Sequence, residues 1–297
     1  MTVWHYNPCM NQATPAASSK PEQPGCLWVV ATPIGHLADL SPRARELLHS
    51  AAVIAAEDTR ISRRLVEDRE APVRWVVLNE HSEDKAVADL IALMSQGQSV
   101  ALISDAGTPL ISDPGYRLVA AAHEAGIQVS PVPGPCAAVA ALSAAGLPSD
   151  RFLFEGFLPA KAGARRQRLA TLSALPTTLI FYVPARDLPA VLKDMADQLG
   201  AERLATVGRE LTKLHETVRR DTLQALQAWC AEDSNQQRGE AVVVVAGNAT
   251  PAADIAVSAL TRELAQALPP SQAAAMLARL TPLSRREAFA LVEQQRS

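Results

Sequence analysis

The chain has 297 residues, of which 48% are hydrophobic and 20% charged, and its 28 Lys and Arg against 31 Asp and Glu leave a formal net charge of −3. This length predicts about two domains of roughly 100–200 residues, and the apolar fraction is sufficient for globular cores. A slightly acidic chain is not expected to coat nucleic acid or a membrane through bulk charge, and no apolar run reaches the ~18–20 residues of a membrane span.

The termini and the cysteines give further expectations about the environment of the protein. The first 25 residues hold four prolines among Ser, Asn and Gln, a composition that predicts a disordered tail. They also lack the pattern of a secretory signal peptide. Cys9, Cys26, Cys136 and Cys230 lie far apart without a C-x-x-C pair. This spacing predicts neither a disulfide framework nor a zinc site, and we expect no bound metal. A cytoplasmic protein without membrane attachment is the expectation.

From Cys26 onward, apolar runs of strand length alternate with segments of helical spacing. The expected strands are Leu27–Ala31, Val53–Ala56, Val73–Leu78, Val100–Ile103 and Val129–Val132. The expected helices between them are Pro42–Ser50, Ser82–Ser95 and Tyr116–Ala125. Ser41 before Pro42 predicts a helix start, because a hydroxyl caps a helix well and proline fits its first position. Strands that are apolar on both faces and alternate with helices indicate a parallel sheet covered by helices.

A second set of strands and helices follows two breaks that contain Pro and Gly. An Ala-rich helix from about Cys136 to Ala145 lies between the breaks. Further strands are expected at Arg151–Phe154, Thr178–Tyr182, Leu204–Gly208 and Ala241–Ala246. From about Pro251 no strand follows, and prolines divide three short helical stretches. The expected organisation is a tail (1–25), an N-terminal α/β domain (26–134), a C-terminal α/β domain (135–249) and a helical appendage (250–297).

Polar loops follow several of the expected strands, where open α/β sheets bind their ligands. Thr32–Leu37 is a tight turn without a phosphate-binding glycine pattern. Glu57–Arg60 gathers charges after an apolar strand, which indicates either a functional site or a helix cap with a surface ion pair. Ser104–Pro109 and Ser112–Gly115 form two Asp-containing turns. We expect Asp105 to accept hydrogen bonds from a ligand, the alternative being that both aspartates only close turns and cap the next helix.

A basic stretch in the second half is the candidate nucleic-acid surface. Between Arg151 and Arg168, five basic side chains stand against one acidic side chain. Helical spacing places residues 161, 165 and 168 on one face, which predicts contact with phosphates, the alternative being a solvated helix face. The RNA-binding candidates are Lys161, Arg165, Arg166 and Arg168.

Five segments resemble the ribosomal RNA small-subunit methyltransferase I family: Leu27–Ala44, Ile54–Arg60, Leu102–Gly115, Val132–Lys161 and Arg209–Glu216. The resemblance spans about Leu27 to Gly247. It implies a two-domain tetrapyrrole-methylase fold with the ligand cleft between the α/β domains, and S-adenosylmethionine as methyl donor. The implied reaction places a methyl group on the ribose 2′-oxygen of a cytidine in small-subunit ribosomal RNA. The resemblance further implies a homodimer that acts on free RNA or on the assembled small subunit.

The resemblance also assigns candidate site residues. Positions that match the donor-binding motifs of the family are Pro33, Gly35, Ile103, Asp105, Thr108, Cys136, Ala137, Val183 and Glu210. The donor is already activated, so the protein chiefly positions the reactants, and a well-placed base can take the hydroxyl proton. The candidates for catalytic work, chosen by their location, are Glu57, Asp58, Arg60, Glu210 and Lys213. Nothing in the sequence selects among them.

Two other functions stay open at this point. A methyltransferase for tetrapyrroles is one, although such enzymes usually open with a G-x-G-x-G-D loop that Thr32–Leu37 does not match. A non-catalytic RNA-binding or ribosome-assembly factor is the other, because Phe181–Leu188 departs from the family pattern. Binding of S-adenosylmethionine would separate the second alternative from an enzyme.

Overall fold

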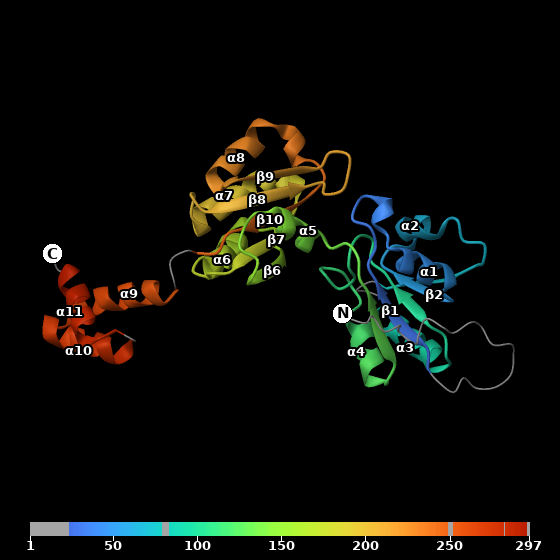
Figure 1. Cartoon of the computed structure of the whole chain (residues 1–297), viewed down its shortest axis with the longest axis horizontal. Helices are drawn as coiled ribbons and strands as arrows, with labels where there is room; N and C mark the ends of the chain where they lie inside the picture. Colours follow the sequence, from blue (N-terminus) through green and yellow to red (C-terminus); the bar gives the residue numbers. More distant parts are fainter. Residues whose placement is uncertain (1–23, 79–82, 249–251, 282, 296–297) are drawn as a thin grey trace, which may run out of the picture. The chain divides into compact units, whose positions relative to one another are not determined.

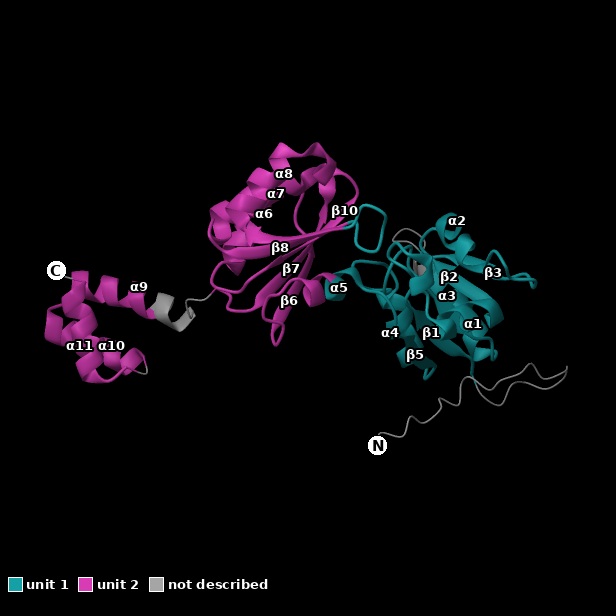
Figure 2. Cartoon of the chain, turned by 45° about the horizontal axis from the view of Figure 1, so that its top comes forward, with its two compact units in different colours: residues 1–140, 210–216 teal, residues 141–209, 217–297 magenta. Residues whose placement is uncertain are grey.

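The computed structural model describes residues 24–78, 83–248, 252–281 and 283–295. They form two compact units (Figure 2): unit 1 holds the described residues up to Ala140 together with Glu210–Glu216, and unit 2 holds Ala141–Arg209 and the described residues from Thr217 onward. The boundary falls inside helix α5 (Ala137–Ala144), and one loop from the C-terminal half of the sequence belongs to unit 1.

Unit 1 is a parallel five-stranded sheet with helices on both faces (Figure 1). Its strands, in spatial order, are β3 (Arg74–Val77), β2 (Val53–Ala56), β4 (Val100–Leu102), β1 (Cys26–Val30) and β5 (Gln128–Val132). Its helices are α1 (Pro42–Ser50), α2 (Thr59–Ser62), α3 (Glu83–Ser95) and α4 (Tyr116–Glu124), with the 3-10 helices η2 (Leu37–Asp39) and η3 (Arg63–Val66). The expected parallel α/β unit is confirmed.

The two faces of this sheet carry separate apolar cores. Leu48 of α1 is fully buried with Trp28 and Ile54 on one face, whereas Leu90 of α3 and Leu118 of α4 are buried on the other. Burying each such leucine contributes about 1.5–3 kcal/mol. Because α1 follows β1 and α4 follows β4, the loops after these neighbouring strands leave the sheet toward opposite faces. Such a point in an open parallel sheet is where ligands usually bind.

Local sequence signals explain where α1 begins. The Ser41 hydroxyl accepts a hydrogen bond from the Ala44 amide at 3.1 Å, and Pro42 occupies the first turn. The predicted cap is confirmed. Loss of such a cap typically costs about 0.5–2 kcal/mol.

Unit 2 contains a mixed sheet, in the spatial order β6 (Phe152–Phe157), β7 (Thr178–Pro184), β10 (Glu240–Val245), β8 (Leu204–Arg209) and β9 (Thr217–Thr222). Only β6 and β7 run parallel, and the other neighbours are antiparallel. Strand β9 does not follow from the sequence pattern. This edge strand reads TVRRDT and is only partly buried, so it lacks the apolar run by which the other strands were recognised.

Three helices pack on one face of this second sheet: α6 (Ala162–Leu172), α7 (Leu188–Leu199) and α8 (Leu223–Glu232). Fully buried Leu169, Leu192 and Leu226 join them to strand residues such as Phe181. The strands and helices of unit 2 therefore share one continuous apolar core.

The C-terminal helices α9 (Ala252–Ala267), α10 (Pro270–Leu280) and α11 (Arg285–Gln294) have an apolar core of their own. Fully buried Ala273, Leu277, Ala288 and Val292 belong to this core. The three predicted helical stretches are thus confirmed. Across the described residues, no helix is both long and apolar enough to span a bilayer.

Candidate functional site

The loops after β1 and β4 are joined by hydrogen bonds at the carboxyl edge of the unit 1 sheet. Thr32 and Gly107 exchange two backbone hydrogen bonds, with N–O distances of 2.8 and 3.1 Å. The buried Thr32 hydroxyl lies 3.2 Å from the Ser104 carbonyl oxygen and 3.3 Å from that of Gly107. The predicted donor positions Pro33, Gly35, Asp105 and Thr108 lie in these two joined loops.

A third loop is held to the same edge by Thr108. Its hydroxyl donates a 2.9 Å hydrogen bond to the carbonyl oxygen of Pro135, next to the predicted donor positions Cys136 and Ala137. Gly107, the residue before Thr108, has a φ of 90°, and a Cβ added there would lie 3.3 Å from Ile34 Cγ2. Glycine is favoured here because this backbone conformation is strained for other residues.

Ile103 belongs to the same edge, but its side chain points into the core. It is 2% exposed, and its amide donates to the Ala55 carbonyl oxygen at 2.9 Å. Any contact of Ile103 with a ligand is therefore left to its backbone carbonyl group.

Asp105 connects the loop after β4 with the loop after β2. One of its carboxylate oxygens accepts a 3.1 Å hydrogen bond from the Asp58 amide, 47 residues away in sequence. Partial burial raises the pKa of Asp105, against the opposing effect of this hydrogen bond. The alternative of a turn-closing side chain is not what the structure has, because the carboxylate bridges two strand ends.

Asp58 and Arg60 form a helix cap and a surface ion pair, the structural alternative to a functional site that the sequence left open for Glu57–Arg60. Asp58 caps α2 by accepting from the Arg60 amide at 2.8 Å, and its carboxylate pairs with the Arg60 guanidinium at 2.9 Å. Hydrogen bonds from Arg60 hold the pKa of Asp58 below its ordinary value. Arg60 is thus occupied by a surface ion pair, whereas Glu57 is exposed and borders the pocket described next.

Asp113, which the sequence pattern indicates only as a turn residue, is a further site candidate. It lines a surface pocket of about 370 Å³ together with Glu57, Tyr116 and Arg117. Burial, with the nearby charges of Glu57 and Asp105, raises the pKa of Asp113 to about 6, although a hydrogen bond from Ser104 opposes the shift. It does not cap α4, whose first position is preceded by Gly115 without a side-chain cap. Its burial was not visible in the sequence.

The loop Glu210–Glu216 packs on the first donor loop within unit 1. The His36 amide donates to the Thr212 hydroxyl oxygen at 3.1 Å, and a Cβ on Gly35 would lie 2.5 Å from Lys213 Cγ. Glycine at position 35 therefore permits the close approach of the two loops.

Within this loop, Glu210 and Lys213 form an ion pair of 2.9 Å. Glu210 and Thr212 have positive φ values of 50° and 64°. Backbone strain of this kind persists where the surroundings impose it, and it is concentrated at functional sites.

Val183, the remaining donor candidate, lies in unit 2. Its side chain is 3% exposed and belongs to the apolar core, and its backbone lies opposite Ala241 of β10. The Val183 side chain therefore packs in the core of unit 2.

The basic stretch is largely used inside unit 2. Arg165, expected on an RNA-facing surface, is buried on α6, where its Nε and Nη2 atoms lie 2.7 and 2.6 Å from the Asp194 carboxylate. Arg168 makes a two-point ion pair with Glu155 at 2.8 and 2.9 Å. The expected shared face of free cations at 161, 165 and 168 is thus not formed, because carboxylates of the same unit neutralise two of the three.

The other two RNA-binding candidates remain accessible. Arg166 is half exposed, with Nη1 3.7 Å from Asp194, and Lys161 is exposed at the start of α6.

Comparison with known proteins points in one direction. Residues 26–227 match the family model of tetrapyrrole (corrin/porphyrin) methylases. The chain is 52% identical to the ribosomal RNA small subunit methyltransferase I of Pseudomonas aeruginosa, over 86% of this chain and 93% of that protein. It is 48% identical to the protein of the same name from Xylella fastidiosa, over 90% of this chain and 98% of that protein.

Among solved structures, the fold resembles uroporphyrin-III C-methyltransferase from Thermus thermophilus complexed with S-adenyl homocysteine. The TM-score is 0.51 at 19% identity, over 75% of this chain and 97% of that chain. At this identity the likeness bears on the fold alone.

Proposed function

We propose that this chain, which belongs to the tetrapyrrole methylase family and within it to the ribosomal RNA small subunit methyltransferase I proteins, transfers a methyl group from S-adenosylmethionine to small-subunit ribosomal RNA. The observation that carries the proposal is the 52% identity to a protein of that name over 86% of the chain. The proposed acceptor is the ribose 2′-oxygen of a cytidine, and the support for it is the motif resemblance.

The residues at the carboxyl edge of the unit 1 sheet fit this donor chemically. One oxygen of Asp105 is held by the Asp58 amide, and the other has no hydrogen bond to a described residue. Ribose hydroxyl and amino groups are the donors that such a carboxylate binds. Pro33, Gly35 and Thr108 lie in two loops that are hydrogen-bonded to each other, and Cys136 and Ala137 follow the Pro135 carbonyl to which Thr108 donates. Backbone amides and carbonyls of these segments supply further polar groups.

S-adenosylmethionine supplies a methyl group already activated by a positively charged sulfur. The chain supplies positioning, and the hydrogen bonds of Thr32 and Thr108 keep the donor loops rigid for that purpose. Asp113, with its pKa raised to about 6, takes the proton of the attacking hydroxyl near neutral pH, and Glu57 lines the same pocket. Arg60, Glu210 and Lys213 act through their ion pairs, which hold the surrounding loops.

The proposal includes the assembly and location expected from the resemblance. The protein acts as a homodimer in the cytoplasm, where small-subunit RNA is available either free or in the assembled subunit.

The direct test uses the purified chain, labelled donor and small subunits from cells that lack the corresponding gene. Transfer of one methyl group per RNA, found as 2′-O-methylcytidine by nucleoside mass spectrometry, is the expected result. Absence of transfer to both free RNA and assembled subunits would overturn the proposal.

A second measurement tests the donor site by calorimetry. Asp105→Ala should weaken binding of S-adenosylmethionine by about 1–3 kcal/mol, because a hydrogen-bonding carboxylate is removed. Asp197→Ala is the matched control, since that exposed carboxylate pairs only with Lys193 on the surface of α7. Equal affinities of the two variants would remove Asp105 from the donor site.

A further inference from the structure

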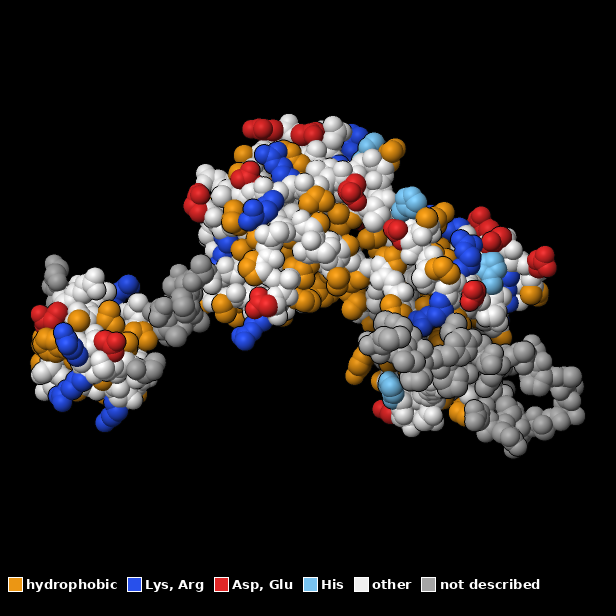
Figure 3. All heavy atoms as spheres, in the orientation of Figure 1, with side chains coloured by type: hydrophobic (Ala, Val, Ile, Leu, Met, Phe, Trp, Pro, Cys, Tyr) orange, Lys and Arg blue, Asp and Glu red, His pale blue; other side chains and the backbone are white. Residues whose placement is uncertain are grey.

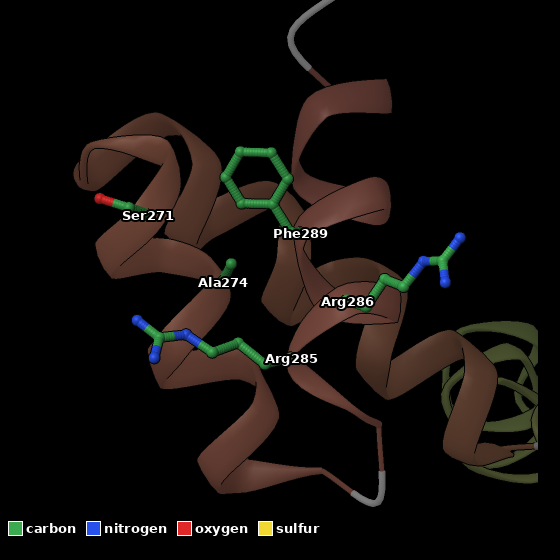
Figure 4. A pocket seen from close by; sticks show the side chains of 5 residues that line it. All are labelled: Ser271, Ala274, Arg285, Arg286 and Phe289. Carbon is green, nitrogen blue, oxygen red and sulfur yellow. The ribbon is translucent and has the colours of Figure 1, made fainter.

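The helices α10 and α11 enclose a surface pocket that the proposed reaction does not use. The pocket has a volume of about 480 Å³ and is lined by Ser271 and Ala274 of α10 and by Arg285, Arg286 and Phe289 of α11. Figure 4 shows Arg285 and Phe289 reaching toward α10, while Arg286 extends from another side of α11. Figure 3 shows basic, acidic and hydrophobic side chains side by side on the C-terminal helices.

The two arginines have no internal role that accounts for them. Both are exposed, and within the described part of the chain neither forms an ion pair. The adjacent carboxylate of Glu287 is engaged by the Ser284 amide at 2.8 Å in the capping box of α11. Two cations in the first turn oppose the helix dipole, so they slightly destabilise α11. Their charge is available to an external anion.

Phe289 adds an apolar surface beside these charges. Its side chain is 43% exposed although the neighbouring Ala288 and Val292 are fully buried in the helical core. An exposed aromatic ring next to arginines is the combination that binds unpaired nucleotides, the ring stacking on a base and the guanidinium groups contacting phosphates.

The charge balance of the chain favours RNA as the occupant. On α6, the predicted RNA-binding residues Arg165 and Arg168 are neutralised by Asp194 and Glu155. The arginine pair on α11 is not neutralised by described carboxylates. A polyanion is complementary to this pair.

We propose that the pocket between α10 and α11 binds an unpaired segment of the substrate RNA. Arg285 and Arg286 contact phosphates, and Phe289 stacks on a base. This inference rests on the proposed function for the identity of the RNA, and it assigns a docking role to the helical part of the chain.

The test compares full-length variants in binding to small-subunit RNA at several salt concentrations. The double variant Arg285→Ala/Arg286→Ala should lower the slope of log K against log salt by about 1.4–1.8, since each phosphate contact contributes about 0.7–0.9. Phe289→Leu keeps an apolar side chain for the core but loses the ring, and should weaken binding about 5- to 150-fold. The matched control is Arg63→Ala/Arg64→Ala, an adjacent exposed pair on η3.

Affinity for S-adenosylmethionine and the circular dichroism spectrum should stay unchanged in all variants. An unchanged salt slope and RNA affinity in both pocket variants would overturn the docking site while wild-type methyl transfer upholds the proposed function. RNA binding by the wild-type chain without methyl transfer would refute the proposed function, and the variants would still decide the docking site. Loss of binding to assembled subunits alone, with free-RNA affinity retained, would identify a protein contact instead and also overturn the inference.

Discussion

At the scale of single residues, Asp113 illustrates how burial converts a turn residue into a candidate base. Its carboxyl group lies near the charges of Glu57 and Asp105, and its pKa is raised to about 6. A base with this pKa is ionised at neutral pH and still accepts protons better than an ordinary carboxylate. The same environment opposes ionisation, so the site is expected to cost stability.

We predict that Asp113→Asn raises stability and lowers activity. The pKa in the folded state lies above the ordinary value of 3.8, so the folded protein binds this proton more tightly than the unfolded chain. The free energy of unfolding of the wild type therefore falls as pH rises from about 4 to about 6. The variant lacks this loss and should be more stable above pH 6 by about 1 kcal/mol, a value reduced for partial exposure.

Denaturant unfolding at several pH values measures the first part, and the stability difference should shrink toward about pH 4. Methyl transfer should fall about 10²–10⁴-fold with donor affinity retained. Asp197→Asn, on an exposed helix surface, is the control. Full activity of Asp113→Asn would show that the proton goes elsewhere.

At the scale of elements, hydrogen bonds between loops and ion pairs between helices decide which polar groups stay available. In unit 1, the loop after β1 is hydrogen-bonded both to the loop after β4 and to the loop Glu210–Glu216. The described non-glycine residues with positive φ lie in the latter two loops: Leu110, Ser112, Glu210 and Thr212. In unit 2, the packing of α6 on α7 joins Arg165 to Asp194. The hydrogen-bonded loops of unit 1 position polar groups at the candidate site, whereas the Arg165–Asp194 pair is part of the packing between α6 and α7.

We predict that Arg165→Ala destabilises the protein by about 3–5 kcal/mol, because it leaves the Asp194 carboxylate buried without its partner. The side chain of Asp194 is 6% exposed. Arg166→Ala, which removes a half-exposed cation 3.7 Å from the same carboxylate, should cost only about 0–1 kcal/mol. Chemical denaturation measures both. A stable Arg165→Ala protein with weakened RNA binding would instead favour the RNA-facing role expected from the sequence.

At the scale of the whole molecule, the chain combines two α/β units with a helical part that has its own core. We predict a homodimer, the assembly expected from the motif resemblance, because two-fold symmetry is the commonest form of oligomer. Light scattering at micromolar concentration should give twice the mass of one chain. A monomer mass at that concentration would contradict the prediction.

Much of the architecture was determined by local sequence. The alternation of apolar strands with helical segments predicted the parallel sheet of unit 1, Ser41 and Pro42 predicted the start of α1, and prolines divided the C-terminal helices. These features follow from side-chain periodicity and helix capping. Both depend on residues only a few positions apart, so they can be predicted from the sequence. The polar loops after the strands were located for the same reason.

Other features were decided only by tertiary structure. The polar edge strand β9 exists because it pairs with β8, and the loop between them belongs to unit 1 through its contacts with Gly35 and His36. The burial of Asp113 and the pairing of Arg165 with Asp194 depend on groups far away in sequence. The charge state and the burial of a side chain depend on the groups that surround it in space. The sequence thus supplied candidate residues in the polar loops, and packing determined which of them remain available for ligands and added Asp113 to them.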